Sequence, residues 1–541
     1  MNRSAKVAAV VAALIATSTA FGAEQPSAQQ GFEELRNTVV NLLQGLVERG
    51  IISKEQAAQM VRDAQSKAVS DGEKAAAVAK AEEGAVRVPY VPQIVKDEIR
   101  RQVASDLNAE VTKNVIDAAQ SEGWGTPSAL PDWVKRMTWS GDIRVRGQYD
   151  QFASDNLPNS YVDFQRVNEA GGIGKAGVNA FLNTTEERQR MRARLRFGFE
   201  SNLGNGWTMG ARITTGNLKD PVSTNLTLGN MGVRYQTGFD LAWLQWVGNS
   251  RTGRQQFTVT GGRLRNPFAN PTDLVFDNDL TFEGLAANYR FGLQRRDWSS
   301  RYAYVTAGAF PLQESELTRD KWLFGGQSGI DWKYEGGSRL RLAAGYYQYQ
   351  NTAGRRNALD STLLDYTAPT WLQKGNTLFD IRNDTDPNTN LFALAADYRL
   401  ANVSAAFDWR VATDYKITLN GDFVRNVGYD AARVQARTGY KVPGRVNGYQ
   451  GDIAFGSAVM NEAGAWRASV GYRYVQRDAV LDGFTDSDFH LGGTDAKGFT
   501  LGFDYSLNGR VMTRLRYLSA NEIDGPPLGI DVVQLDVTAS F

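Results

Sequence analysis

Residue types that usually carry catalysis are scarce in this 541-residue sequence, which has one histidine and no cysteine. The absence of cysteine excludes disulfides, zinc–thiolate sites, iron–sulfur clusters and thiol nucleophiles. A hydrolase would need His490 to act with Ser487, but both lie in one predicted loop, where we expect His490 to be solvated. The sequence therefore predicts neither an enzyme nor a metal site.

Two short motifs resemble ligand-binding sites but lack the context that those sites need. Residues 172–177 read GIGKAG and match a dinucleotide-binding glycine pattern, yet no predicted strand–helix unit surrounds them. The acidic run 384–390 resembles the start of a calcium loop, but Thr389 stands where glycine is required and Ala395 where glutamate is required. We predict no cofactor.

Arginine follows the most regular pattern in the chain, because it occupies every second position from Arg188 to Arg196 among mostly apolar residues. On a helix these side chains would surround the axis, whereas on a strand they share one face. Several arginines facing lipid would cost on the order of 10 kcal/mol. The pattern therefore predicts a membrane strand with its basic face toward water; an amphipathic strand of a soluble sheet is the alternative.

The same alternation assigns two arginines of the preceding strand to the water-filled side. The candidate pore-lining residues are Arg144, Arg146, Arg190, Arg192, Arg194 and Arg196. Other inward arginines are expected at 212, 339, 341, 467, 473, 514 and 516, and inward acids at 142, 150, 200, 452, 504 and 536. A basic wall raises the local anion concentration, so we predict anion preference. The alternative, that facing carboxylates neutralise many of these arginines, stays open.

Period-two segments recur to the end of the chain and predict sixteen strands. They are 138–152, 187–202, 206–216, 238–248, 255–266, 282–293, 301–312, 321–335, 338–352, 389–401, 414–427, 447–460, 464–478, 496–508, 510–521 and 531–541. Their connections alternate between short and long, as in outer-membrane barrels with tight periplasmic turns. The predicted fold is an all-β transmembrane barrel of about sixteen antiparallel strands over 138–541, wide enough for an aqueous channel.

The N-terminal part has a different character. Residues 1–23 combine a basic start, a short apolar core and small residues, which is typical of a secretory signal peptide. Residues 24–137 show apolar spacings of three and four, which predict a helical region, expected in the periplasm. This region is either a packed helical domain or an oligomeric coiled coil. A net charge of +1 argues against nucleic-acid binding.

Several segments resemble the putative porin family of Gram-negative outer membranes. They include NLLQGLVERGIISKEQA (41–57), WGTPSALPDWVKRMTWSGDIRVR (124–146), ERQRMRARLRFGFE (187–200), GRLRNPF (262–268) and LVFDNDLTFEGLA (274–286). The resemblance implies a pore for small hydrophilic solutes in outer-membrane lipid, with a possible homotrimer. The alternating last strand ends at Phe541, which resembles the assembly signal read by the barrel insertion machinery.

The loop 265–284 is the third long connection, which in sixteen-stranded porins folds inward as the constriction. By this resemblance Asp273, Asp277, Asp279 and Glu283 are candidate constriction residues, although an exposed acidic loop would have the same composition. The rival function is a structural outer-membrane protein or surface receptor that tethers the membrane through the helical region. A blocked lumen would favour that rival.

Overall fold

The computed structural model describes residues 58–59, 62, 132–250, 253–293, 300–316 and 318–541. Contacts divide the chain into two units, Met1–Val115 and Ile116–Phe541. The predicted signal peptide and nearly all of the predicted helical region lie outside the described residues. Among the described residues, no helix is long and apolar enough to cross a bilayer.

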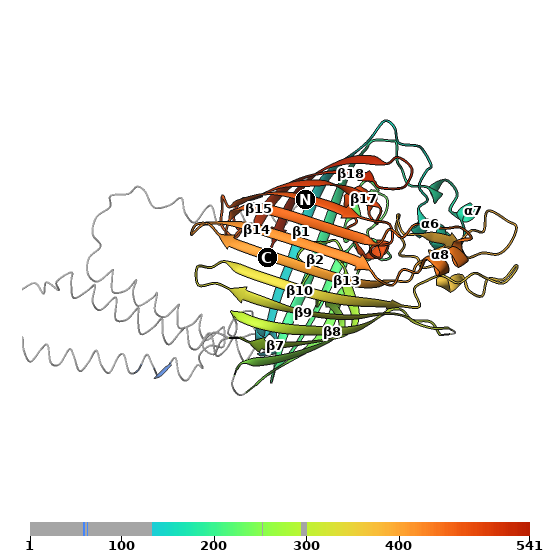
Figure 1. Ribbon diagram of the computed structural model, residues 1–541. Helices are drawn as coiled ribbons and strands as arrows, with labels where there is room; N and C mark the ends of the chain where they lie inside the picture. The colour runs from blue at the N-terminus through green and yellow to red at the C-terminus, as the bar shows by residue number, and fades with distance from the viewer. Residues whose placement is uncertain (1–57, 60–61, 63–131, 251–252, 294–299, 317) are drawn as a thin grey trace, which may run out of the picture. The chain divides into compact units, whose positions relative to one another are not determined.

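Sixteen long antiparallel strands of the described residues form one closed barrel (Figure 1). They are β1 (Met137–Phe152), β2 (Arg188–Gly204), β3 (Trp207–Thr215), β5 (Thr237–Asn249), β6 (Gln255–Arg265), β7 (Thr281–Gly292), β8 (Arg301–Gln313), β9 (Lys321–Lys333), β10 (Arg339–Gln350), β13 (Arg399–Arg410), β14 (Tyr415–Asn426), β15 (Asn447–Ser457), β16 (Trp466–Val475), β17 (Ala496–Ser506), β18 (Val511–Glu522) and β19 (Gly529–Ser540). The first strand closes the barrel, because Asp142 of β1 pairs with Arg196 of β2 on one side and with Ser540 of β19 on the other.

Alternation along each strand explains the two faces of the wall. On β1, Ile143 and Val145 are exposed on the outside, while Arg146 is 2% exposed on the inside. Aromatic rings gather near the short turns, where Trp139 stacks on Phe197 with a ring-centroid distance of 5.4 Å. The outer face of the wall is thus apolar and the inner face charged, as expected for a membrane barrel.

Fifteen of the predicted strands lie within three residues of the observed ones, but the prediction of 389–401 was wrong. The strand at this position is β13, which begins at Arg399. Leu394, Ala396 and Tyr398 are fully buried inside a loop, and their apolar run does not alternate. In β13, exposed positions alternate with buried ones, as at Val403 and Ser404, so the period of two begins with this strand.

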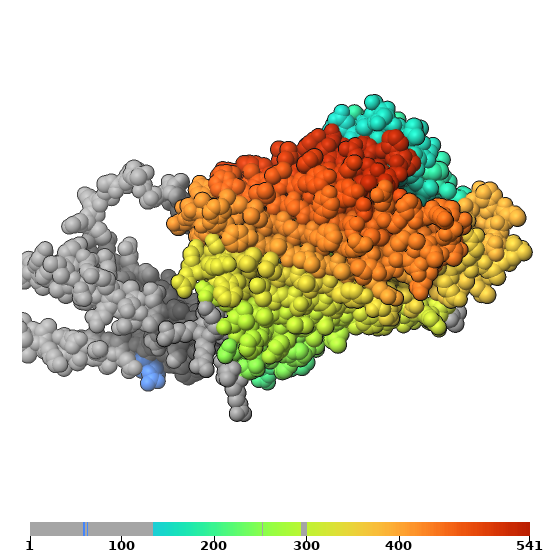
Figure 2. All heavy atoms as spheres, viewed as in Figure 1, coloured from blue at the N-terminus to red at the C-terminus, as the bar shows by residue number. Residues whose placement is uncertain are grey.

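The remaining elements lie in the connections between barrel strands or before β1. The short strands are β4 (Leu226–Thr227), β11 (Leu378–Asp380) and β12 (Phe392–Leu394). The helices are α5 (Asp132–Lys135), α6 (Phe164–Ala170), α7 (Ile173–Ala176) and α8 (Ala431–Thr438), with 3₁₀ turns η1 (Gly177–Ala180), η2 (Asp365–Thr367), η3 (Asp482–Phe484) and η4 (Phe489–Leu491). Figure 2 shows this face of the barrel as a continuous wall, with the loops 153–187 and 351–398 beyond one end.

Several long connections form a common apolar core with the barrel wall. They include the segments 266–280, 351–398 and 476–495, which contribute Phe276, Leu394 and Phe484 among other side chains. These pack against inward residues of the wall such as Tyr347 and Leu518. Part of the lumen is therefore occupied by loops of the same chain.

Candidate functional site

The six candidate pore-lining arginines form one patch on two adjacent strands. In the register of β1 and β2, Arg144 faces Arg194 and Arg146 faces Arg192. We call Arg144, Arg146, Arg190, Arg192, Arg194 and Arg196 the arginine wall. Like charges this close require counter-charges, because a buried unpaired guanidinium would be strongly destabilising.

Carboxylates of the barrel itself supply part of this counter-charge. Asp142 accepts hydrogen bonds from Arg194 at 2.7 Å and from Arg196 at 2.6 Å. Asp536 of β19 accepts two from Arg146, at 2.6 and 2.9 Å. Arg190 pairs with Asp150 at 2.6 Å. The neutralisation that the sequence left open therefore operates at these arginines.

The segment 266–280 crosses the lumen. Its Phe268 packs edge-on against Tyr347 of β10, with ring centroids 5.0 Å apart, and Thr272 donates a hydrogen bond to Asp422 of β14 at 3.0 Å. At its far end, Asp279 lies 3.3 Å from Arg196 and 3.8 Å from Arg194. A carboxylate of this loop thus faces the arginine wall.

The other acidic residues predicted for this loop have different surroundings. Asp273 accepts a hydrogen bond from Gln450 of β15 at 3.0 Å, on the opposite wall. Burial raises the pKa of Asp277 well above its usual range, and the nearby carboxylates Asp486 and Asp279 raise it further. Glu283 does not belong to the segment: it lies on β7 and pairs with Arg263 of β6.

Sequence reasoning missed the segment 476–495, which brings a further carboxylate to the arginine wall. Asp488 lies 2.7 Å from Arg146, 3.7 Å from Arg192 and 2.6 Å from Arg516 of β18. Burial alone would raise the pKa of Asp488, yet Arg146, Arg516 and Arg192 together hold it below its usual range. The signal in the sequence was the mixture of aspartates with Val480, Leu481 and Phe484 in a long connection, which is unusual for a solvated loop.

The prediction of a solvated His490 was wrong, because its side chain is fully buried. Its Nδ1 lies 2.7 Å from the Lys374 ammonium, and its Nε2 lies 2.9 Å from the Leu528 carbonyl oxygen. Nδ1 therefore accepts from Lys374 and Nε2–H donates to Leu528. Burial and the Lys374 charge lower the pKa of His490 well below its usual value, so the ring is neutral.

The connection 216–236 also contacts the arginine wall. Asn225 accepts a hydrogen bond from Arg144 at 2.5 Å, and Ser223 accepts one from Arg192 at 3.3 Å. Thr224 donates to Asp279 at 3.0 Å. The wall is thus contacted by three connections that are separate in sequence.

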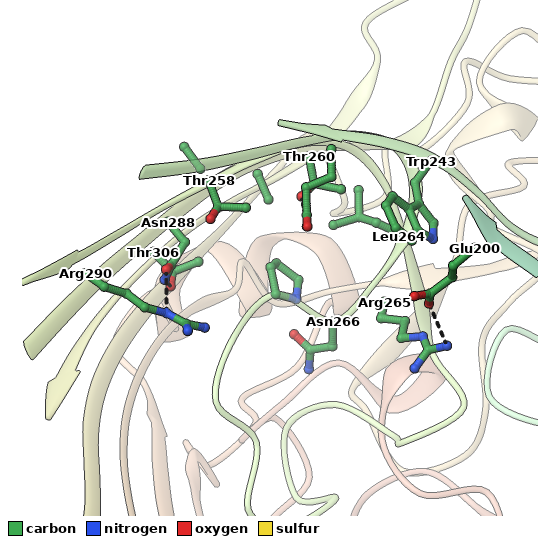
Figure 3. Close-up of a pocket in the computed structure, with 14 residues that line it drawn as sticks. Glu200, Trp243, Thr258, Thr260, Leu264, Arg265, Asn266, Asn288, Arg290 and Thr306 are labelled. Atoms are coloured by element: carbon green, nitrogen blue, oxygen red, sulfur yellow. Dashed lines mark hydrogen bonds and ion pairs between the residues drawn. The ribbon is translucent and has the colours of Figure 1, made fainter. Parts of the chain in front are cut away.

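Two polar hollows lie along the inner face. One of about 360 Å³ is lined by residues of β5 to β8, and Figure 3 shows Thr258, Thr260 and Asn288 among its lining residues. Another of about 290 Å³ lies between the segment 266–280 and β14–β18, and Arg516 lines it. Hydroxyl, amide, guanidinium and carboxylate groups line both hollows, which suits hydrated solutes.

The two ligand-like motifs pack against each other. The Gly174 backbone N–H, within GIGKAG, donates to the Asn388 carbonyl oxygen at 2.9 Å, so the glycine motif packs on the acidic run. The Asp384 side chain accepts from Thr389, and Asp386 accepts from Asn388. Within the part of the chain that the structure describes, no group of three or more His, Cys, Asp or Glu side chains is arranged to hold a metal ion.

Comparison with models of protein families identifies the family of this chain. Residues 36–541 match the model of a family described as putative porin. The chain belongs to the putative porin family. This confirms the resemblance seen in the sequence and supports an outer-membrane channel rather than an enzyme.

Solved structures of outer-membrane proteins are similar to the chain at low identity. OprB of Pseudomonas putida at high pH has a TM-score of 0.42 and 12% identity, over 77% of this chain and 97% of that chain. The outer-membrane channel DcaP of Acinetobacter baumannii has a TM-score of 0.38 and 12% identity, over 75% of this chain and 97% of that chain. OmpF of Salmonella typhi, in complex with daunomycin, has a TM-score of 0.39 and 9% identity, over 75% of this chain and 97% of that chain. No curated protein matches the sequence.

Proposed function

We propose that the chain is a porin whose lumen lets small hydrophilic solutes diffuse past the arginine wall. The observation that carries this proposal is the inner lining, where polar hollows of about 360 and 290 Å³ lie along charged and hydroxyl-bearing strands. The proposal includes a homotrimer in outer-membrane lipid, insertion through the Phe541 signal, and a periplasmic N-terminal region.

Anion preference is the finer part of the proposal, and it follows from the balance of charges. The arginine wall together with Arg516 provides seven guanidinium groups. Among the described residues, five carboxylates lie within 4.0 Å of them, namely Asp142, Asp150, Asp279, Asp488 and Asp536. The excess of positive charge would concentrate anions at the wall.

Conductance of the purified full chain in a planar bilayer tests both parts. We expect discrete current steps and, in a KCl gradient, a reversal potential displaced to the anion side. A reversal potential on the cation side would refute the anion preference alone. A folded, inserted barrel that carries no current would refute the channel and favour the structural or receptor function.

A further inference from the structure

Asp488 is the shared counter-charge of three arginines that come from three different strands. Its carboxylate contacts Arg146 of β1, Arg192 of β2 and Arg516 of β18, at 2.7, 3.7 and 2.6 Å. These arginines do not depend on Asp488 equally. Arg146 also holds Asp536 through two hydrogen bonds and would stay neutralised without Asp488.

Arg192 and Arg516 have no second carboxylate partner among the described residues. Among the described residues, Asp488 is the one carboxylate within 4.0 Å of either guanidinium. Their other hydrogen-bond partners are neutral: Arg516 donates to Gln534 at 3.0 and 2.6 Å, and Arg192 donates to Gln148 at 3.4 Å and Ser223 at 3.3 Å. Removing Asp488 would therefore leave two guanidinium groups facing the lumen with no carboxylate.

The carboxylate is attached to a loop and not to the barrel sheet. The Asp488 backbone N–H donates to Asp486 at 2.8 Å, Ser487 donates to the Val222 carbonyl at 3.2 Å, and the Phe484 carbonyl accepts from the Asp277 N–H at 2.8 Å. These three contacts join loop to loop, while Thr485 and Asp486 of the same loop also contact Arg473 of β16. Asp488 can consequently leave the arginines without breaking any strand pairing of the barrel.

The site is also within reach of a solute in the lumen. The side chain of Arg516 is 22% exposed and that of Asp488 is 16% exposed. Arg516 lines the hollow of about 290 Å³, together with the arginines Arg467, Arg473 and Arg514 and the carboxylates Asp273, Asp452, Asp486 and Asp504. A small molecule in this hollow meets the Arg516 guanidinium group, whose carboxylate partner Asp488 is on a loop.

We propose that Arg192 and Arg516 form a binding site for the carboxylate of a small organic acid passing through the barrel, and that Asp488 is a tethered carboxylate that occupies this site between passages. The inference rests on the proposed channel function and adds its solute class. A free carboxylate can make the same charge-assisted hydrogen bonds as Asp488, because guanidinium recognises any planar carboxylate through paired N–H groups. Passage then becomes a competition between solute and loop.

The test compares malonate with malonamide, its uncharged diamide, as blockers of single-channel current in 0.1 M KCl. The proteins are the unchanged full chain, Asp488→Asn, and the control Asp397→Asn. Asp397 pairs with Arg433 and Arg437 at 3.1 and 3.4 Å outside the barrel strands, so this control removes a similarly paired charge away from the arginine wall.

We expect Asp488→Asn to raise the anion-to-cation permeability ratio and to lower the malonate concentration for half-block by about tenfold, because a competitor at millimolar effective concentration is gone. Malonamide should block none of the three proteins, and Asp397→Asn should match the unchanged chain. If Asp488→Asn does not yield a folded barrel, Arg516→Gln in the otherwise unchanged chain should shift selectivity toward cations and weaken malonate block.

Suppose that the unchanged chain conducts and that Asp488→Asn shows the same malonate block and the same permeability ratio as the unchanged chain. This result would overturn the inference and leave the channel function intact. Unaltered block and selectivity in Arg516→Gln would overturn it equally. Absence of current through the unchanged chain would refute the channel function itself, so the two failures are distinct.

Discussion

At the scale of single residues, the inner wall consists of charges that neutralise one another. Arg146 is 2% exposed and donates to both Asp536 and Asp488. A complete buried ion pair adds little net stability, but removal of one partner leaves an uncompensated charge. We expect Asp536 to matter most for stability, because its carboxylate on the last strand accepts hydrogen bonds from Arg146 on the first strand.

We expect Asp536→Asn to lower the free energy of unfolding by about 3 kcal/mol, since among the described residues it leaves Arg144 with no carboxylate within 4.0 Å and Arg146 with one in place of two. The thermal unfolding midpoint in detergent, followed by circular dichroism, measures the change. The contrasting variant is Glu335→Gln. Glu335 is 98% exposed and lies 4.0 Å from Arg301, so its loss should cost less than about 0.5 kcal/mol. Equal midpoints for the two variants would contradict the role given to Asp536.

Asp486 provides a prediction about pH. Burial and the carboxylate of Asp273 raise the pKa of Asp486 to about 7, although Arg473 and Arg516 oppose the shift. Asp277 and Asp488 are the other titratable groups that face Asp486. The folded loop therefore keeps a proton that the unfolded chain releases near pH 4. This stabilisation is complete below about pH 4 and is lost as the pH rises through 7.

Hydrogen exchange of residues 484–490, corrected for intrinsic rates, should therefore be faster at pH 8 than at pH 5. Asp486→Asn should remove most of this difference. His490 acts in the opposite direction, since its lowered pKa favours the folded loop above pH 6.5, but it is present in both proteins. A pH dependence that is the same in both proteins would show that Asp486 does not control the loop.

At the scale of elements, alternation decides which substitutions a strand tolerates. On β17, Leu501 is 49% exposed on the outer face, whereas its neighbour Thr500 lines the inner hollow of about 290 Å³. An arginine costs about 2–4 kcal/mol near the lipid midplane and little in an aqueous lumen. Adjacent positions should thus respond oppositely to the same substitution.

We expect Leu501→Arg to abolish most folded barrel, and Thr500→Arg to fold and displace the reversal potential further toward the anion side. Folding is measured by heat-modifiable migration on a gel, and the potential in a planar bilayer. A folded Leu501→Arg with an unfolded Thr500→Arg would mean that the faces of β17 are reversed.

Most of the barrel strands could be predicted from the sequence, because each face imposes its own residue type at every second position. The exception, 389–401, shows where this reasoning ends. Leu394 and Ala396 are apolar because they are buried against other loops, not because they face lipid. Local periodicity does not distinguish the two environments when an apolar run is short.

The candidate site was predictable only on its strand side. Alternation placed the arginine wall, but it could not identify Asp488 or Asp279 as partners, since loop positions depend on packing between distant segments. The same limit explains His490, whose burial results from contacts with Lys374 and Leu528. Counter-charges from loops, and hence the net charge of the lumen, require the three-dimensional structure.

At the scale of the whole molecule, the barrel depends on the pairing of β1 with β19. Phe541 and Gly141 exchange backbone hydrogen bonds of 3.1 and 3.2 Å, and the Phe541 ring lies over Gly141. A Cβ at Gly141 would come within 2.6 Å of the Arg196 carbonyl oxygen and 2.7 Å of that ring. At Gly147, on the same strand, a Cβ would have no atom within 4 Å.

We therefore expect Gly141→Val to reduce the yield of closed barrel by about tenfold, equivalent to about 1.4 kcal/mol, and Gly147→Val to leave it unchanged. The yield is measured as the heat-modifiable fraction after refolding into detergent. Equal yields would show that the seam tolerates a side chain at Gly141.

The pairing of Asp142 with Ser540 also has a consequence for the order of events during biogenesis. The first barrel strand leaves the ribosome long before its second neighbour exists, and until then its free edge can pair with any other chain. No intermediate length of this chain has a closed sheet. The incomplete sheet therefore keeps exposed edges until β19 pairs with β1, and that last pairing removes them.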